Sequence, residues 1–249
     1  MNKYLFVLIS LWLFTSCATR KQIVYFQDSE DLNQTIRSLN FEPIIESNDV
    51  LHISVSALDE AAVVPFQRDT GNQQSGQNIL LQGYLVNAEG QIQFPTLGAI
   101  DVKGKTRREV EIYLKDQLSE FIKDVVIDVR IMNFKVTVLG EVMVPGVHRI
   151  VDERVTLLEA IALAGDLTED ARRDDVTIIR EESGVQTVAK VDILTTDFIN
   201  SPYYFLKQND VVYIEPSLKG VKKSGLIPDV PAMLSFVTIV LSTVILLTR

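Results

Sequence analysis

The most informative part of the 249-residue sequence is residues 84–121, YLVNAEGQIQFPTLGAIDVKGKTRREVEIYLKDQLSEF. It begins as an apolar strand, turns at residues 87–90 and continues as an alternating strand at 91–94, which Pro95 ends. Thr106-Arg107-Arg108-Glu109 then forms a capping box, because the Thr hydroxyl and the Glu carboxylate satisfy free amides of a first helical turn. Apolar residues recur behind it at three- and four-residue spacing. This pattern predicts one helix packed against small strands.

Residues 135–165 repeat the same order of elements. A strand at 135–139, the turn Val144-Pro145-Gly146 and a strand at 147–151 precede a second capping box, Thr156-Leu157-Leu158-Glu159. Gly165 then stands where a left-handed helix cap is expected. Strands outnumber helices and the helices come singly, so we predict an α+β fold with small mixed or antiparallel sheets and single capping-box helices.

A shorter motif recurs at the start of strands. Asn48-Asp49-Val50 returns as Asn209-Asp210-Val211, with a weaker copy at Asp174-Asp175-Val176. In each copy a polar turn that ends in Asp leads into a β-branched strand, so these carboxylates are predicted to stabilise turns and not to form a catalytic set.

The composition excludes several classes of function. Lys and Arg number 24 against 33 Asp and Glu, a net charge of −9, and no clustered basic surface is evident, so we predict no nucleic-acid partner. The chain has one Cys, Cys17, and two His, His52 and His148, which cannot assemble a disulfide or a Cys/His zinc site in one copy. We predict no metal and no cofactor.

Catalytic motifs are absent from the sequence. There is no phosphate-binding Gly-x-x-x-x-Gly-Lys loop, no Gly-x-Gly-x-x-Gly after a strand and no Gly-x-Ser-x-Gly elbow. The carboxylate pairs Asp59-Glu60 and Glu181-Glu182 look like solvated turns and not like a glycosidase pair. We therefore predict no catalytic residue and no enzymatic activity.

The N-terminal residues look like a targeting segment. A basic start is followed by an apolar run at 4–14, too short to span a bilayer, and Thr15 and Ser16 lead into Cys17. This resembles a lipobox, so we predict a signal peptide at 1–16, lipidation of Cys17 by palmitate-type acyl chains and a polar tether at 17–40. The alternative is an uncleaved signal anchor with an incidental cysteine. Ala18 resembles the residue found in lipoproteins sorted to the outer membrane.

The C-terminal residues form a second membrane-type segment. A linker at 217–231 leads into residues 232–248, which carry no charge. As a helix these seventeen residues would measure about 26 Å, at the short end for a transmembrane helix and suited to a thin membrane such as the bacterial outer membrane. We predict one C-terminal transmembrane helix here.

That helix is faintly amphipathic. With about 100° per residue, Ser235, Thr238, Ser242 and Arg249 fall within an arc of roughly 60°. A polar stripe facing lipid brings no benefit, so we predict that it lies at a helix contact or lines a pore. The alternative is that the hydroxyls bond to carbonyls of their own helix and are tolerated anywhere.

The motifs resemble a known family, the outer-membrane polysaccharide export lipoproteins of the Wza type. The similarity covers residues 48–216. Gly83-Tyr84-Leu85-Val86, the run GQIQFPTLG at 90–98 and VKGKT at 102–106 resemble the polysaccharide-export domain, which we place at 41–134. VLGEV at 138–142, Pro145-Gly146 and TLLEAIALAG at 156–165 resemble the SLBB (soluble-ligand-binding β-grasp) domain, which we place at 135–216.

The resemblance implies a homo-oligomeric ring whose C-terminal helices form a barrel across the outer membrane, through which a capsular polysaccharide or exopolysaccharide passes. It also implies an inner-membrane partner, a chain-length regulator of the co-polymerase or tyrosine-kinase type. The chain has one β-grasp repeat where longer members have two, so a shorter periplasmic vestibule is expected. Localisation would be the outer membrane, lipid-anchored, with the domains in the periplasm.

Two other functions fit the sequence less well. One is a non-conducting periplasmic scaffold or adaptor lipoprotein that binds carbohydrate. The other is an envelope enzyme acting on glycans, which would need a carboxylate pair in a cleft.

Overall fold

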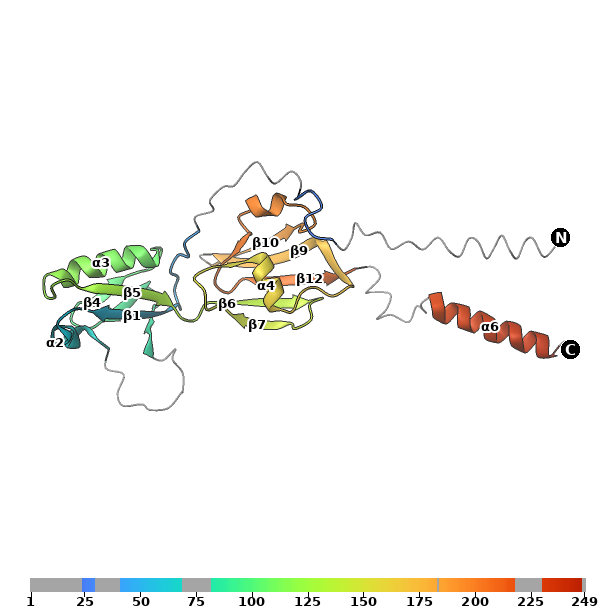
Figure 1. Ribbon diagram of the computed structural model, residues 1–249, viewed down its shortest axis with the longest axis horizontal. Coiled ribbons are helices and arrows are strands. Elements are labelled where there is room, and N and C mark those ends of the chain that lie inside the picture. The colour runs from blue at the N-terminus through green and yellow to red at the C-terminus, as the bar shows by residue number, and fades with distance from the viewer. Residues whose placement is uncertain (1–23, 30–40, 69–81, 183, 218–229, 248–249) are drawn as a thin grey trace.

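The computed structural model describes residues 24–29, 41–68, 82–182, 184–217 and 230–247. These residues form two domains that each combine helices and strands, a docked N-terminal segment and a C-terminal helix (Figure 1). The predicted signal peptide, Cys17, most of the 217–231 linker and Arg249 lie outside the described residues.

The first domain packs one long helix, two short helices and five strands around a single core. Its central strand β1 pairs antiparallel with β2 on one side and β5 on the other, and β3 and β4 form a separate hairpin. Helix α3 buries Val110, Leu114 and Leu118 against this sheet. In chain order the elements are β1 (Val50–Ser56), α2 (Glu60–Val63), η3 (Val64–Phe66), β2 (Tyr84–Leu85), β3 (Gln91–Phe94), β4 (Gly98–Asp101), α3 (Arg107–Ser119) and β5 (Val126–Ile131).

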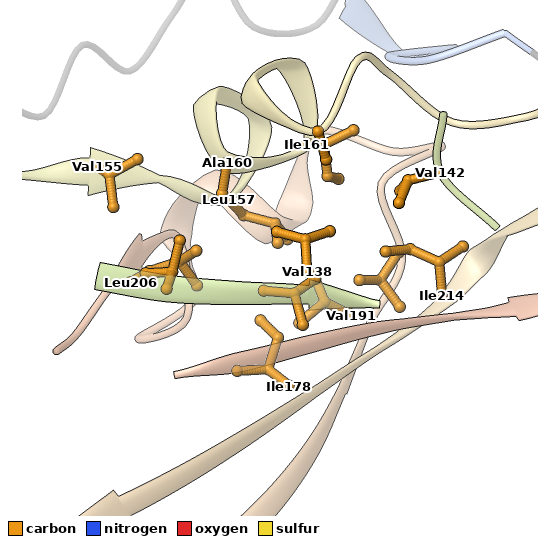
Figure 2. Packing of buried hydrophobic residues seen from close by; sticks show 14 of the residues in the cluster. Val138, Val142, Val155, Leu157, Ala160, Ile161, Ile178, Val191, Leu206 and Ile214 are labelled. Atoms are coloured by element: carbon orange, nitrogen blue, oxygen red, sulfur yellow. The ribbon is translucent and has the colours of Figure 1, made fainter. Parts of the chain in front are cut away.

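The second domain has a five-stranded sheet in the order β10-β9-β12-β6-β7. All of its neighbouring strands run antiparallel except β12 and β6, which are parallel. Helix α4 packs on one face, where Leu157 and Ala160 meet Val138 of β6 (Figure 2). The elements are β6 (Lys135–Gly140), β7 (Gly146–Arg149), β8 (Val155–Thr156), α4 (Leu157–Leu163), β9 (Ala171–Glu182), β10 (Val185–Val191), η5 (Asp197–Asn200), β11 (Phe205–Leu206) and β12 (Val211–Pro216).

Both predicted capping boxes are present. In α3, the amide of Glu109 donates to Thr106 Oγ1 and the amide of Thr106 donates to Glu109 Oε2. Thr156 and Glu159 make the same reciprocal bonds at α4. These bonds satisfy free first-turn amides and set where each helix begins.

The predicted fold class is confirmed in its main feature, small sheets with single helices in an α+β arrangement. The predicted C-terminal helix is also present, as α6 (Val230–Leu247). Its role as a transmembrane helix is not confirmed, because no helix among the described residues combines the length and the apolar character needed to cross a membrane.

Candidate functional site

The N-terminal residues 24–29, which we call the clasp, lie against the second domain (Figure 1). Phe26 stacks on Phe198 with ring centroids 5.9 Å apart. Asp28 accepts hydrogen bonds from the amide and the hydroxyl of Thr196 at 2.8 and 2.9 Å. The sequence predicted a polar tether across residues 17–40 and did not indicate that the clasp makes these contacts. The partners of the clasp lie far away in the sequence, so its local pattern gives no sign that it docks.

Tyr25 joins the clasp to two charged residues of the second domain. Its hydroxyl donates to Asp166 Oδ1 at 2.7 Å, and the Arg173 guanidinium lies 5.6 Å from the ring centroid. Burial, followed by the hydrogen bond to Asp166, raises the pKa of Tyr25 to about 12. The phenol therefore stays protonated and keeps donating at any physiological pH. Arg173 is itself buried, and its guanidinium donates to the backbone carbonyls of Ala171 and Thr168. The clasp therefore covers a guanidinium that already has hydrogen-bond partners in the second domain.

Two amide side chains fasten the first domain to the second. Asn133 Oδ1 accepts from the amide of Val50, and its Nδ2 donates to the carbonyl of Asn48, both at 2.9 Å. From the other domain, Gln208 Nε2 donates to the carbonyl of Asn133 at 2.9 Å, and Gln208 Oε1 accepts from the amide of Lys135 at 2.8 Å. Asn133 and Gln208 thus satisfy the backbone where the chain passes between domains.

Side chains on either side of this connection add further contacts between the domains. Phe41 stacks on Phe205 with centroids 4.7 Å apart, and Arg107 of α3 forms a 2.9 Å ion pair with Glu153. A cavity of about 270 Å³ lies beside them, with Ile131 and Phe134 among its apolar walls. The cavity is smaller than most sites for drug-sized ligands. We regard it as a gap in the packing where the two domains meet.

The recurring Asn-Asp-Val motif stabilises turns in its two stronger copies, whereas the weaker copy, Asp174-Asp175-Val176, lies inside strand β9, so the turn prediction is wrong there. Asp49 Oδ2 accepts from the amide of Glu46 at 2.9 Å, and Asp210 Oδ2 accepts from the amide of Lys207 at 2.8 Å. In both copies the preceding Asn has a left-handed backbone, with φ 72° at Asn48 and 65° at Asn209. Asn tolerates this conformation better than most residues.

The two buried carboxylates of this motif differ in their charged partners. Asp210 forms a bidentate pair with the buried Arg180, whose Nη2 lies 2.7 Å from Asp210 Oδ2. Asp49 has no such cation among the described residues, and burial raises its pKa to about 6, with the amide of Glu46 acting in the opposite direction. Asp210 is therefore neutralised by a partner, whereas Asp49 takes up a proton near pH 6.

Three members of the predicted C-terminal stripe are described, on α6. Thr238 Oγ1 donates to the carbonyl of Ser235 at 2.8 Å, and Ser242 Oγ donates to the carbonyl of Thr238 at 2.7 Å. Thr243, which lies off the stripe, bonds to the carbonyl of Ile239 in the same way. These bonds are the ones that the alternative explanation of the stripe requires, so a helix contact or a pore lining remains a prediction.

One member of each carboxylate pair named in the sequence has a structural partner. Asp59 caps α2 by accepting from the amide of Ala61, and Lys207 binds Glu182 at 2.6 Å, which lowers the pKa of Glu182. Across the described ranges, no group of three His, Cys, Asp or Glu residues is placed to hold a metal ion.

Comparison with known proteins matches both domains. Residues 40–132 match the family described as polysaccharide biosynthesis/export protein, and residues 134–214 match the SLBB domain. The chain is 34% identical over 140 residues to the EPS I polysaccharide export outer membrane protein EpsA of Ralstonia solanacearum. It is 33% identical over 138 residues to the protein of the same name from Ralstonia nicotianae (strain ATCC BAA-1114 / GMI1000). Each match covers 54% of this chain and only 36% of the relative.

Proposed function

The chain belongs to the polysaccharide biosynthesis/export protein family, and we propose from this premise that it takes part in exporting a polysaccharide at the outer membrane. The observation that carries the proposal is the order of its two domains, export domain then SLBB domain, each with its own core. The protein would perform no chemistry on the polymer.

The physical task is confinement. A hydrated polysaccharide cannot enter hydrocarbon, so a closed wall must line its path, and only helices or closed barrels satisfy backbone groups in lipid. We propose that copies of this chain form a ring, with the α6 helices around the exit. The Thr238 and Ser242 hydroxyls would lie at helix contacts or face the passage.

We propose that two anchors hold the ring at the membrane. Acyl chains on Cys17 provide the first, and the clasp makes this anchor short, since Val24 follows only seven residues later. Seven residues span at most about 25 Å. Because α6 also follows the SLBB domain in the chain, the SLBB domain would lie next to the membrane and the export domain away from it. The export domain would then face the inner-membrane chain-length regulator.

A labelling experiment tests the first anchor. Cells producing the wild-type chain should incorporate radioactive palmitate into it, and Cys17→Ser should abolish the label, because the thiol is the acylated atom. Ser16→Ala, one residue earlier, serves as the matched control and should keep the label. Labelling of the Cys17→Ser chain would refute the lipoprotein proposal.

Imaging of the detergent-extracted full-length protein tests the function. Closed rings with a continuous lumen, together with loss of surface polysaccharide when the protein is absent, are expected. Assembly without a lumen would favour a carbohydrate-binding scaffold. If one carboxylate substitution abolished export while rings still formed, an enzyme acting on glycans would be favoured.

A further inference from the structure

The five-stranded sheet of the SLBB domain has two unpaired edges. Strand β10 pairs only with β9, and β7 pairs only with β6, among the residues that the structure describes. Neither strand contains proline, which proteins often place on an edge to prevent pairing. Open edges of this kind accept a strand from another chain.

The strand register places one row of side chains across the whole sheet. Val188 lies opposite Ile179, and Ile179 lies opposite Val211. Val211 in turn lies opposite Thr137, and Thr137 lies opposite Val147. Residues opposite each other on neighbouring strands point to the same face. Since Val138 and Ile178, the next residues along β6 and β9, are buried under α4, this row faces outward.

Exposure along this row is greatest at its two ends. Val188 on the β10 edge is 66% exposed and Val147 on the β7 edge is 61% exposed. The three residues between them are half-buried. The two valines are therefore left open at the positions where a neighbouring sheet would cover them.

Charged side chains also lie on this outward face near both edges. On the β7 side, Lys135 lies directly opposite Arg149, an unfavourable pairing of like charges, and no described carboxylate forms an ion pair with either. On the β10 side, the exposed Glu181 of the neighbouring strand β9 lies opposite Gln186, and Lys190 of β10 is paired with Asp175. The cations beside β7 and the Glu181 carboxylate beside β10 are complementary between copies.

We propose that neighbouring copies join head to tail through these edges, β7 of one copy beside β10 of the next, with Val147 against Val188. Counting strand directions across the sheet, β7 runs opposite to β10, so copies in the same orientation would pair antiparallel. The contact uses two different surfaces of each subunit, and repetition of such a contact closes a ring when the rotation permits. The inference rests on the proposed ring and names the surface that closes it.

Disulfide cross-linking of the full-length protein in membranes tests this contact. Within one sheet, Val147 and Val188 are separated by four inter-strand spacings, about 19 Å, which a disulfide cannot bridge. Any bond between cysteines at these two positions must therefore join two chains. Under mild oxidation, the Val147→Cys/Val188→Cys chain should give a ladder of covalent oligomers on a non-reducing gel.

Three controls make the result specific. Val147→Cys alone and Val188→Cys alone should stay monomeric, because a head-to-tail contact never places two identical positions together. In the third control, Val188→Cys is replaced by Val185→Cys, which is 62% exposed on the same strand but points to the other face. This pair should give little or no ladder. Circular dichroism should match the wild-type chain for every variant.

Each other outcome overturns the inference. Dimers from either single variant would mean that the edges pair symmetrically. Rings seen by microscopy without a ladder above the Val185 control would mean that another surface closes the ring, leaving the proposed function intact. Absence of both rings and ladders would overturn the ring itself.

Discussion

Replacing Asp49 with Asn is expected to stabilise the export domain at neutral pH and to remove a pH dependence that the wild-type domain shows. Asp49 is 2% exposed, and within the described part of the chain its carboxylate accepts one hydrogen bond, from the amide of Glu46. An Asn side chain has nearly the same shape and can accept the same hydrogen bond through its oxygen. The substitution therefore removes the charge and little else.

The magnitude follows from the pKa of Asp49. Burial raises this pKa from 3.8 to about 6 in the folded chain. At about 1.4 kcal/mol per pKa unit, the buried charge lowers the free energy of unfolding by about 3 kcal/mol at pH 7. Because the folded pKa is the higher one, the stabilising effect of the protonated group is complete below pH 4 and is lost as the pH rises through 6.

Hydrogen exchange of export-domain peptides, compared between Asp49→Asn and wild type at each pH, measures this difference. The intrinsic exchange rate cancels in the comparison. The variant should be protected more than wild type by up to roughly 100-fold at pH 7. The ratio should fall steadily between pH 6 and pH 4.5.

The matched control is Glu120→Gln, an exposed carboxylate at the end of α3 in the same domain. Its protection ratio should stay near one at every pH. A ratio for Asp49→Asn that did not change with pH would refute the reasoning, because it would mean that Asp49 is charged in the folded chain at no cost.

Other substitutions test the remaining features. Asp210→Asn should destabilise the SLBB domain by about 3–5 kcal/mol in urea unfolding, because it leaves a buried guanidinium without its counter-charge. Phe26→Ala should free the clasp at a cost of about 2 kcal/mol and speed its cleavage in limited proteolysis, whereas equal cleavage rates would mean that the clasp is not held by this ring. Thr238→Leu should impair export of the polysaccharide while the assembly extracted in detergent keeps its size, and Val237→Leu should change neither. Equal tolerance at both positions would mean that the stripe has no role in export.

Local signals in the sequence were sufficient to predict α3 and α4, whereas the short helices α2, η3 and η5 were not predicted. The two capping boxes join residues three positions apart, so their hydrogen bonds are set by the tetrapeptide alone. The turn role of Asp49 and Asp210 was predictable for the same reason, since each accepts from an amide three residues before it. These predictions needed no knowledge of the tertiary fold.

The clasp could not be predicted in this way. Tyr25 bonds to Asp166, which is 141 positions away, and Asp28 bonds to Thr196, which is 168 positions away. Residues 24–29 carry no hydrophobic period that would indicate a docked segment. The role of the adjacent Tyr25 and Phe26 becomes clear only once β9 and η5 supply their partners.

The pairing of charged residues near the β7 edge could not be predicted from the sequence either. The sequence places Lys135 and Arg149 in different strands with no indication that they lie opposite each other, since that depends on the length of the turn between β6 and β7. The parallel pairing of β6 with β12 likewise joins segments more than 70 residues apart. The strand register determines which residues form the outward-facing row from Val188 to Val147, and this register exists only in the assembled sheet.

The hydroxyl bonds within α6 bear on where the assembly gains its stability. Because Thr238 and Ser242 already donate to carbonyls of their own helix, a bond to a neighbouring helix would replace an existing one and add little free energy. The edges β7 and β10, by contrast, expose apolar side chains and backbone groups that gain partners only when another copy arrives. We therefore expect contacts of the SLBB domain to determine whether copies associate. The α6 helices would then form the wall of the passage at the centre of the ring. Substitutions at the sheet edges should then abolish α6 contacts as well, whereas changes confined to α6 should leave the domains associated.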